Sequence, residues 1–177
     1  PKADDQSRNT GDDGSQHDML AQLELDESDF RNLMTHCNER GIDFLSTPFG
    51  EGPADMLERI GVSAFKVSSG DLTHHRFLAH LASKGLPIIL STGMANLAEV
   101  DEALRVIDAA GPVPVALLHC VSAYPADPAS CNLSAMETMA RAFDRPVGWS
   151  DHTQGVAIGF AAVALGARLI EKHITLD

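Results

Sequence analysis

Two histidines near the end of the chain are candidates for metal ligands. His152 follows an apolar run at residues 147–149, and His173 follows another at residues 168–170. A helical run of small residues, 156–165, separates them. The order predicts a strand, a helix and a strand, with both histidines at the carboxyl edge of a parallel sheet, where α/β proteins bind ligands. Because neutral imidazole is the commonest side-chain metal ligand, we expect a shared divalent metal. The alternative is that one histidine only packs or forms hydrogen bonds at a strand end.

Small polar residues follow each apolar run of this kind. The six runs lie at residues 44–45, 65–67, 88–90, 115–118, 147–149 and 169–170. Hydroxyl groups, exposed amides of glycine turns and Lys66 supply hydrogen-bond donors that suit one phosphate or carboxylate. In any single turn such residues are ordinary caps and turn formers. Six of these ends at one edge of a sheet favour an anion site.

The alternation of apolar runs with helical segments predicts an α/β fold, with a parallel sheet and helices outside it. One helix is expected to begin at Asp26, a good N-cap, and to end at Gly41, which suits a left-handed C-cap. Another is expected at residues 97–110. We interpret residues 1–25 as a polar loop and lead-in segment and residues 26–177 as one domain.

The composition is that of a globular protein with an acidic surface. The 177 residues are 44% hydrophobic and carry a net charge of -12, with a sequence pI near 4.9. Such a charge argues against nucleic acid or an anionic membrane as a partner, and no apolar run reaches the about 18 residues of a membrane span. Three cysteines without CxxC spacing or an export signal indicate reduced thiols in the cytoplasm. Because the chain begins at Pro1, we expect it to be part of a longer protein.

Six ordered motifs resemble the N-acetylneuraminate (sialic acid) synthase family. They are FLSTPF (44–49), FKVSSGD (65–71), PIILSTGM (87–94), LLHCVSAYP (117–125), SDHT (150–153) and EKHITLD (171–177). The resemblance implies a (β/α)8 TIM barrel that is incomplete here, with about strands 3 to 8 present. The family's first two strands, which carry a catalytic glutamate and a phosphate-binding lysine, and its C-terminal antifreeze-like domain have no counterpart.

The resemblance also implies a reaction. Members of this family condense phosphoenolpyruvate with an N-acetylated hexosamine, such as N-acetylmannosamine, to form a nonulosonic acid and release phosphate, with Mn or Mg as cofactor. A cytoplasmic homodimer is expected for the full-length protein, whereas the isolated chain is expected to be inactive. Alternatives are the same chemistry on another sugar, giving a legionaminic-type or spore-coat nonulosonic acid, a 3-deoxy-sugar-phosphate synthase, and a non-catalytic fragment that binds a metal or an anion.

Site residues carry over from the same motifs and, for Asn9, from a further match at NTG (9–11). Phosphoenolpyruvate contacts are expected from Thr47, Lys66, Ser69, Ser91, Ser122 and Ser150. Catalytic roles are expected for Lys66, Asp71, Tyr124 and Glu171, sugar contacts for Asn9, Asp71 and Tyr124, and metal ligation for His152 and His173. Asp71 departs from the glutamate of sialic-acid-forming members, which leaves the sugar open.

Neighbouring residues of these motifs are expected to have different roles, because successive side chains of a strand face opposite sides of the sheet. Glu171 is expected on the same side of its strand as His173, and Lys172 on the opposite side, without a catalytic role. His119 ends an apolar run, and we expect it to support the structure rather than to bind a ligand.

Overall fold

The computed structural model describes residues 2, 6–7, 10–11 and 15–176. The chain divides into two compact units, Pro1–Ile42 and Asp43–Asp177, so the division falls after the helix that begins at Asp26 and not before it. Asn9 lies outside the described residues. Among the residues that the structure does describe, none of the helices has both the length and the apolar character that a membrane crossing requires.

The first unit contains α2 (Gln16–Ala21) and α3 (Glu27–Arg40). The predicted start of α3 is confirmed: the Asp26 carboxylate accepts a hydrogen bond from the Asp29 amide at 3.0 Å, and the Asp29 carboxylate accepts one from the Asp26 amide at 3.2 Å. This reciprocal pair satisfies two amides that have no partner within the helix. The predicted end is also confirmed, since Gly41 has a φ of 69°. The described part of the lead-in segment thus includes the short helix α2.

The second unit is built on a sheet of five parallel strands in the order β1-β2-β3-β4-β5. The strands are β1 (Phe65–Val67), β2 (Ile88–Ser91), β3 (Val115–Cys120), β4 (Val147–Asp151) and β5 (Ile170–Lys172). The strand predicted at residues 44–45 is wrong, since these residues are outside the sheet. An apolar run of two residues makes few ladder hydrogen bonds, and Pro48 removes a donor just after it.

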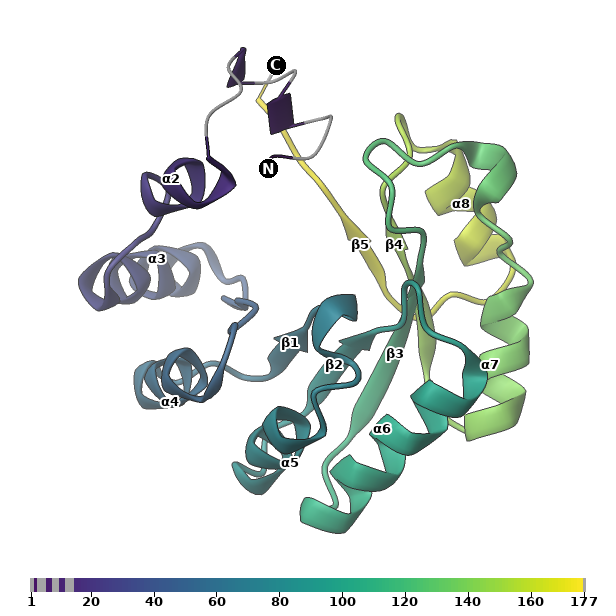
Figure 1. Ribbon diagram of the computed structural model, residues 1–177, viewed down its shortest axis with the longest axis horizontal. Coiled ribbons are helices and arrows are strands. Elements are labelled where there is room, and N and C mark those ends of the chain that lie inside the picture. Colours follow the sequence, from purple (N-terminus) through teal and green to yellow (C-terminus); the bar gives the residue numbers. More distant parts are fainter. Residues whose placement is uncertain (1, 3–5, 8–9, 12–14, 177) are drawn as a thin grey trace. The chain divides into compact units, whose positions relative to one another are not determined.

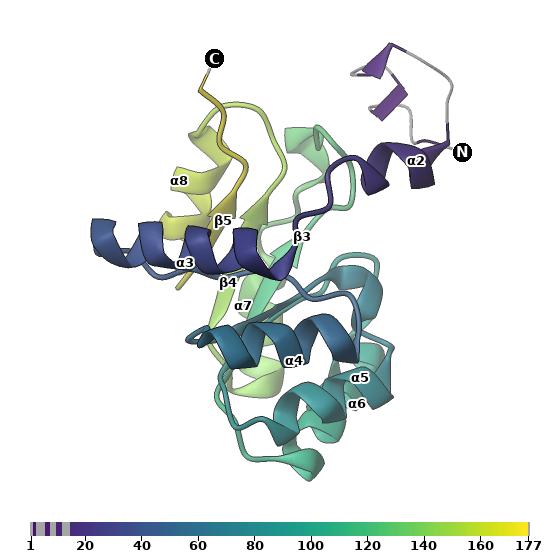
Figure 2. The ribbon, with the colours of Figure 1, turned by 90° about the vertical axis from the view of Figure 1, so that its left-hand side faces the viewer.

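Helices alternate with the strands and cover the outer side of the curved sheet (Figure 1). They are α4 (Glu51–Ile60), α5 (His75–Ser83), α6 (Leu97–Ala110), α7 (Ala135–Phe143) and α8 (Ala157–Ala164). Helices α4, α5 and α6 lie side by side in both ribbon views (Figures 1 and 2). The result is a half-barrel of β/α units, as expected for an incomplete TIM barrel.

The core lies between the strands and these helices. From the sheet it contains Phe65, Leu90, Leu117 and Trp149, all with less than 1% of their surface exposed, and from the helices it contains Phe77, Leu81, Val100 and Ile107. Helix α6 shows why the packing forms here: Asn96 caps it through the amides of Ala98 and Glu99, and the residues at helical spacing after the cap are buried. The predicted helix at 97–110 is confirmed.

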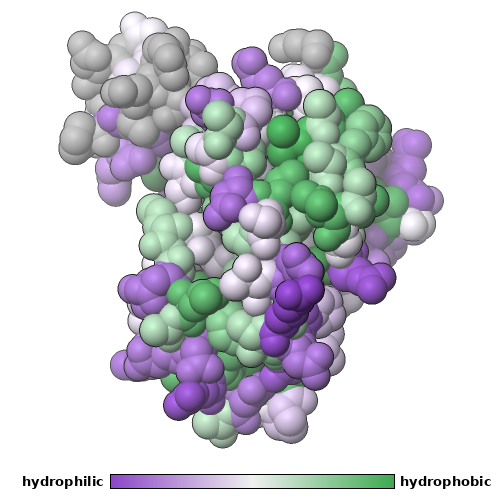
Figure 3. Space-filling model, turned by 90° about the vertical axis from the view of Figure 1, so that its right-hand side faces the viewer, coloured by the Kyte–Doolittle hydropathy of each residue, from purple (hydrophilic) through white to green (hydrophobic). Residues whose placement is uncertain are grey.

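Helix α8 differs from the others because it is apolar on nearly all sides. Its region exposes Val156, Phe160, Val163 and Leu165, each by more than half of its surface. Apolar side chains gather on the upper part of the face shown in Figure 3. A helix of this composition is usually covered on every side, so its exposed surface has the character of a contact surface.

Candidate active site

A polar cavity of about 330 Å³ lies at the carboxyl ends of the strands. Parallel sheets collect their ligand-binding groups at this edge because all strands end there. The cavity is lined by Phe49, Lys66, Ser68, Ser69, Gly70, Ser91, Met94, Cys120, Ser122, Tyr124, Ser150, His152 and Glu171. Most of the residues expected to bind phosphoenolpyruvate are therefore brought together.

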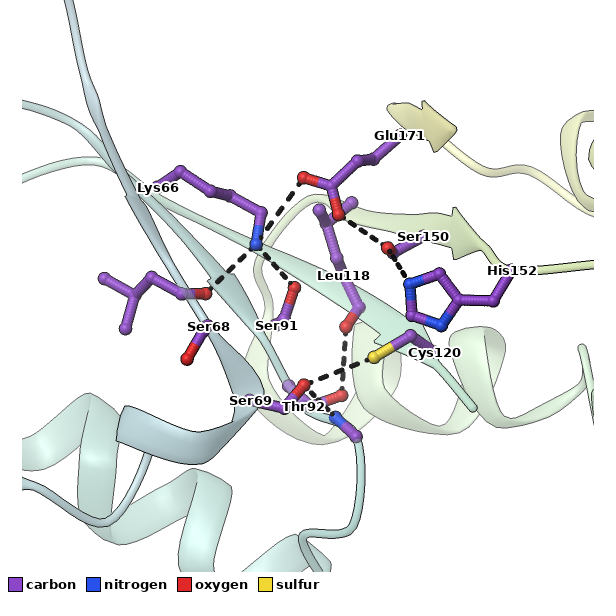
Figure 4. Close-up of polar contacts among 12 residues, drawn as sticks. Lys66, Ser68, Ser69, Ser91, Thr92, Leu118, Cys120, Ser150, His152 and Glu171 are labelled. Atoms are coloured by element: carbon purple, nitrogen blue, oxygen red, sulfur yellow. Dashed lines mark hydrogen bonds and ion pairs between the residues drawn. The ribbon is translucent and has the colours of Figure 1, made fainter. Parts of the chain in front are cut away.

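Lys66 is the cation of this cavity (Figure 4). Its side chain is only 12% exposed. The ammonium group donates to Ser91 Oγ at 2.8 Å and to the Val67 carbonyl at 3.1 Å, and lies 3.5 Å from Glu171 Oε2. A largely buried ammonium group held by one hydroxyl, one carbonyl and one carboxylate offers a charge-assisted donor to a bound anion.

The ends of three strands, β1, β2 and β3, meet beside this lysine through Ser69, Gly93 and Cys120. Ser69 Oγ accepts a hydrogen bond from the Gly93 amide at 2.9 Å and lies 3.3 Å from Cys120 Sγ. A Cβ atom at Gly93 would come within 2.6 Å of Ser122 Oγ and 2.8 Å of Cys120 Sγ. The close approach of the strand ends thus needs a glycine here. The sequence analysis did not single out Gly93 or Cys120 as site residues. Cys120 lies two residues after Leu118 in β3, and this spacing indicates that the two side chains share one face of the sheet.

Glu171 and His152 are joined through Ser150 (Figure 4). Ser150 Oγ donates to Glu171 Oε1 at 2.6 Å and lies 3.3 Å from His152 Nε2. The other ring nitrogen, Nδ1, is 2.6 Å from the Val121 carbonyl oxygen. Because a carbonyl only accepts, we assign the proton to Nδ1. Nε2, which lies 3.3 Å from Ser150 Oγ, is the nitrogen on the side of the cavity.

His152, His173 and Tyr124 form a group of rings. The ring centroids of Tyr124 are 4.2 Å from His152 and 5.7 Å from His173, and those of the two histidines are 5.7 Å apart. Bonds of about 2.1 Å from one nitrogen of each ring can reach a shared ion across such a separation. Among the described residues no group of three or more histidine, cysteine, aspartate or glutamate side chains has the arrangement of a metal site.

Other expected residues lie beside the cavity rather than in its wall. Asp71 Oδ2 accepts a hydrogen bond from Ser68 Oγ at 3.0 Å. Thr47 lines a neighbouring hollow of about 470 Å³, whose wall also includes Lys66 and Glu171. The hollow and the cavity therefore share the lysine and the glutamate.

The outer side of the strands carries a different set of polar groups. His119 packs its ring against Trp149, with centroids 5.1 Å apart, and its Nε2 lies 2.9 Å from the Cys131 carbonyl oxygen. Burial lowers the pKa of His119, although the nearby carbonyl groups oppose this shift. Lys172 binds Asp151 and does not line the cavity that Glu171 lines, although it does border the neighbouring hollow. Burial by itself would raise the pKa of Asp151, but hydrogen bonds from Lys172 and Thr153 outweigh burial and lower it.

The half-barrel and the polar groups at its carboxyl edge define an α/β protein of the TIM-barrel type with a candidate ligand site at the strand ends, and comparisons with known proteins identify its family. The chain belongs to the NeuB family, whose model matches residues 1–177. It is 46% identical to the N,N'-diacetyllegionaminic acid synthase of Campylobacter jejuni, over 99% of this chain and 53% of that protein. It is 36% identical to human N-acetylneuraminate-9-phosphate synthase, over 88% of this chain and 43% of that protein.

Solved structures agree with this assignment. The N-acetylneuraminic acid synthetase of Leptospira borgpetersenii, in complex with citrate, superposes with a TM-score of 0.83 at 38% identity, over 87% of this chain and 54% of that one. A phospho-2-dehydro-3-deoxyheptonate aldolase of Thermotoga maritima has a TM-score of 0.73 at 17% identity, over 82% of this chain and 46% of that one, and shows the fold alone. The chain spans about half the length of the relatives that it matches.

Proposed function

We propose that the protein containing this chain condenses phosphoenolpyruvate with an N-acetylated hexosamine to form a sialic-acid-type nonulosonic acid with release of phosphate. The observation that carries the proposal is the convergence of Lys66 with the hydroxyls of Ser69, Ser91 and Ser150 on one cavity. Membership of the NeuB family supports it. The cytoplasmic homodimer is part of the same proposal and rests on the family resemblance.

In the proposed reaction, C3 of phosphoenolpyruvate bonds to the aldehyde carbon of the open-chain sugar, water then adds at C2, and phosphate leaves. The substrate carries both a phosphate and a carboxylate, so fixed donors are needed before and during the bond formation. Lys66 would bind the phosphoenolpyruvate anion with Thr47, Ser69, Ser91, Ser122 and Ser150 as hydroxyl donors. Glu171, which contacts both Lys66 and Ser150, would fix the directions of those two donors.

His152 and His173 would hold a divalent ion, Mn²⁺ or Mg²⁺. The position of His152 Nε2 on the cavity side, with Nδ1 held by the Val121 carbonyl, and the placement of His173 beside the same tyrosine fit this role. When bound, such an ion supplies a Lewis acid for the aldehyde oxygen. Tyr124 and Asp71 would lie on the sugar side, and we keep Asn9 in the same role from the motif alone.

The identity of the sugar is a separate part of the proposal. A legionaminic-type substrate is the second candidate, and one observation favours it: the two N,N'-diacetyllegionaminic acid synthases are 46% and 44% identical to this chain, whereas the N-acetylneuraminate-9-phosphate synthases are 36% identical. Asp71 is consistent with a sugar other than N-acetylmannosamine. Its carboxylate is one methylene shorter than a glutamate and reaches a hydroxyl from a different distance.

The test is a phosphate-release assay on the full-length protein with phosphoenolpyruvate and Mn²⁺. N-acetylmannosamine, a diacetamido sugar and no sugar are compared, and products are identified by mass spectrometry. We expect phosphate release only with an N-acetylated sugar, together with a product that contains the carbon atoms of both substrates. Phosphate release that does not depend on any sugar, or a product without the sugar carbons, would contradict the proposal.

A further inference from the structure

An ion pair lies directly behind the candidate site, on the outer side of the sheet. Asp151 is the last residue of β4 and Lys172 the last of β5, and the two are opposite each other in the strand register. Lys172 Nζ donates to Asp151 Oδ2 at 2.8 Å. The Asp151 side chain is fully buried, whereas Lys172 is 27% exposed. Neither residue lines the polar cavity described above.

Both members of the pair also bind the residue that follows His152. Asp151 Oδ1 accepts hydrogen bonds from the Thr153 amide at 3.0 Å and from Thr153 Oγ1 at 2.7 Å. Lys172 Nζ donates a second hydrogen bond, to the Thr153 carbonyl at 2.8 Å. The backbone on both sides of His152 is thus fixed to β5, while the His152 carbonyl itself accepts from the Ala126 amide at 2.9 Å.

We propose that Asp151 and Lys172 are positioning residues that aim His152 Nε2 at the candidate site. The inference deepens the proposed function and rests on it. Removing a carboxylate completely from water costs free energy unless its partners replace the lost hydration, and here every partner holds the turn that carries the histidine. The ring itself is oriented by the Val121 carbonyl, 2.6 Å from Nδ1, as such partners orient metal-binding histidines, and Asp151 and Lys172 fix the backbone that carries the ring.

The test measures Mn²⁺ binding by the full-length protein without any turnover. Electron paramagnetic resonance of free Mn²⁺ gives the dissociation constant for the native protein and for Lys172→Met. We expect the variant to bind Mn²⁺ about tenfold more weakly, the lower end of the range for losing a group that orients a metal ligand, because Lys172 acts on the backbone beside His152 and not on its ring. Its kcat should fall while its KM for phosphoenolpyruvate changes little, because the Lys66 contacts are untouched.

Lys84→Met is the matched control. Lys84 is also a mostly buried lysine, 9% exposed, and binds Asp55 and Glu58 between α5 and α4. Its loss should lower the free energy of unfolding without changing Mn²⁺ affinity. The double variant Asp151→Asn with Lys172→Met should bind Mn²⁺ no more weakly than Lys172→Met alone, since residues that act as one unit are not additive.

The outcomes separate the inference from the function on which it rests. A native protein that binds no Mn²⁺ contradicts the proposed metal site and removes the basis of the inference. A native protein that binds Mn²⁺ while Lys172→Met binds it equally well contradicts the inference alone. If Lys172→Met does not fold, Thr153→Val keeps the ion pair and removes only the hydroxyl bond. It should weaken Mn²⁺ binding by about fivefold at most, and no weakening at all would overturn the inference.

Discussion

Replacing Lys66 by methionine in the full-length protein tests the anion site most directly. Methionine keeps most of the length and volume of the side chain, as far as Cε, but removes the ammonium group. The Lys66 side chain is 12% exposed, and its ammonium group points to Ser91 Oγ and Glu171. A hydrogen bond to a charged group is worth about 1.5–3 kcal/mol, so we expect kcat/KM for phosphoenolpyruvate to fall by about 10- to 150-fold.

The same substitution should change stability little. Ser91 loses one donor, but Glu171 is 41% exposed and remains hydrated. The variant also no longer removes a cation from water, which offsets the lost contacts. We therefore expect the free energy of unfolding to change by no more than about 1 kcal/mol.

Two measurements check this prediction. Phosphate release at varied phosphoenolpyruvate concentration gives kcat/KM, and urea unfolding gives stability. Lys84→Met is the control, because it removes a lysine that lies outside the site and should leave kcat/KM unchanged. Native kinetics combined with a large loss of stability in Lys66→Met would show that Lys66 is structural and would refute the reasoning.

Three further predictions follow. Gly93→Ala should raise the KM for phosphoenolpyruvate and lower the free energy of unfolding by about 1–3 kcal/mol, because its methyl group would lie 2.6 Å from Ser122 Oγ. Gly52→Ala, whose added methyl group has open space around it, is the control. Equal kinetics for the two variants would contradict the crowding argument. Hydrogen bonds from Lys84 and His80 lower the pKa of Asp55 in the folded protein. The ionised carboxylate therefore stabilises the fold at pH values above the unfolded pKa of about 3.9, and this stabilisation is lost as the pH falls through the lower folded pKa. We therefore measure the free energy of unfolding in urea from pH 3 to 7, and expect it to fall less on acidification for Asp55→Asn than for the native protein. The same pH dependence in both proteins would contradict this role of Asp55. The 177-residue chain alone should be inactive and should form oligomers through the outer strands β1 and β5; a monomer in size-exclusion chromatography that releases phosphate would disprove this.

Much of the local structure could be predicted from the sequence because its causes are local. The boundaries of α3 depend on Asp26 and Gly41, and α6 begins after Asn96. Strands β1 to β5 lie at the apolar runs that alternate with helical segments. The run at residues 44–45 does not form a strand. Strand pairing depends on contacts with a neighbouring strand, and two apolar residues are too few to predict it from composition.

The candidate site was predictable in outline and not in its contacts. Polar residues after each strand were visible, and alternation placed Glu171 and Lys172 on opposite sides of β5. Which groups meet was not visible. Gly93 gave no chemical signal, and its importance follows only from the distances between turns that are far apart in the sequence.

The sequence alone determined the order of strands and helices, the helix caps and the residue types at the strand ends, since these depend on neighbours a few positions away. Only the tertiary structure decided that Lys66 meets Ser91 and Glu171 and that Lys172 holds the turn beside His152 from behind. The physical reason is the register of parallel strands, which sets the height of each side chain at the sheet edge and is established only when the strands pair.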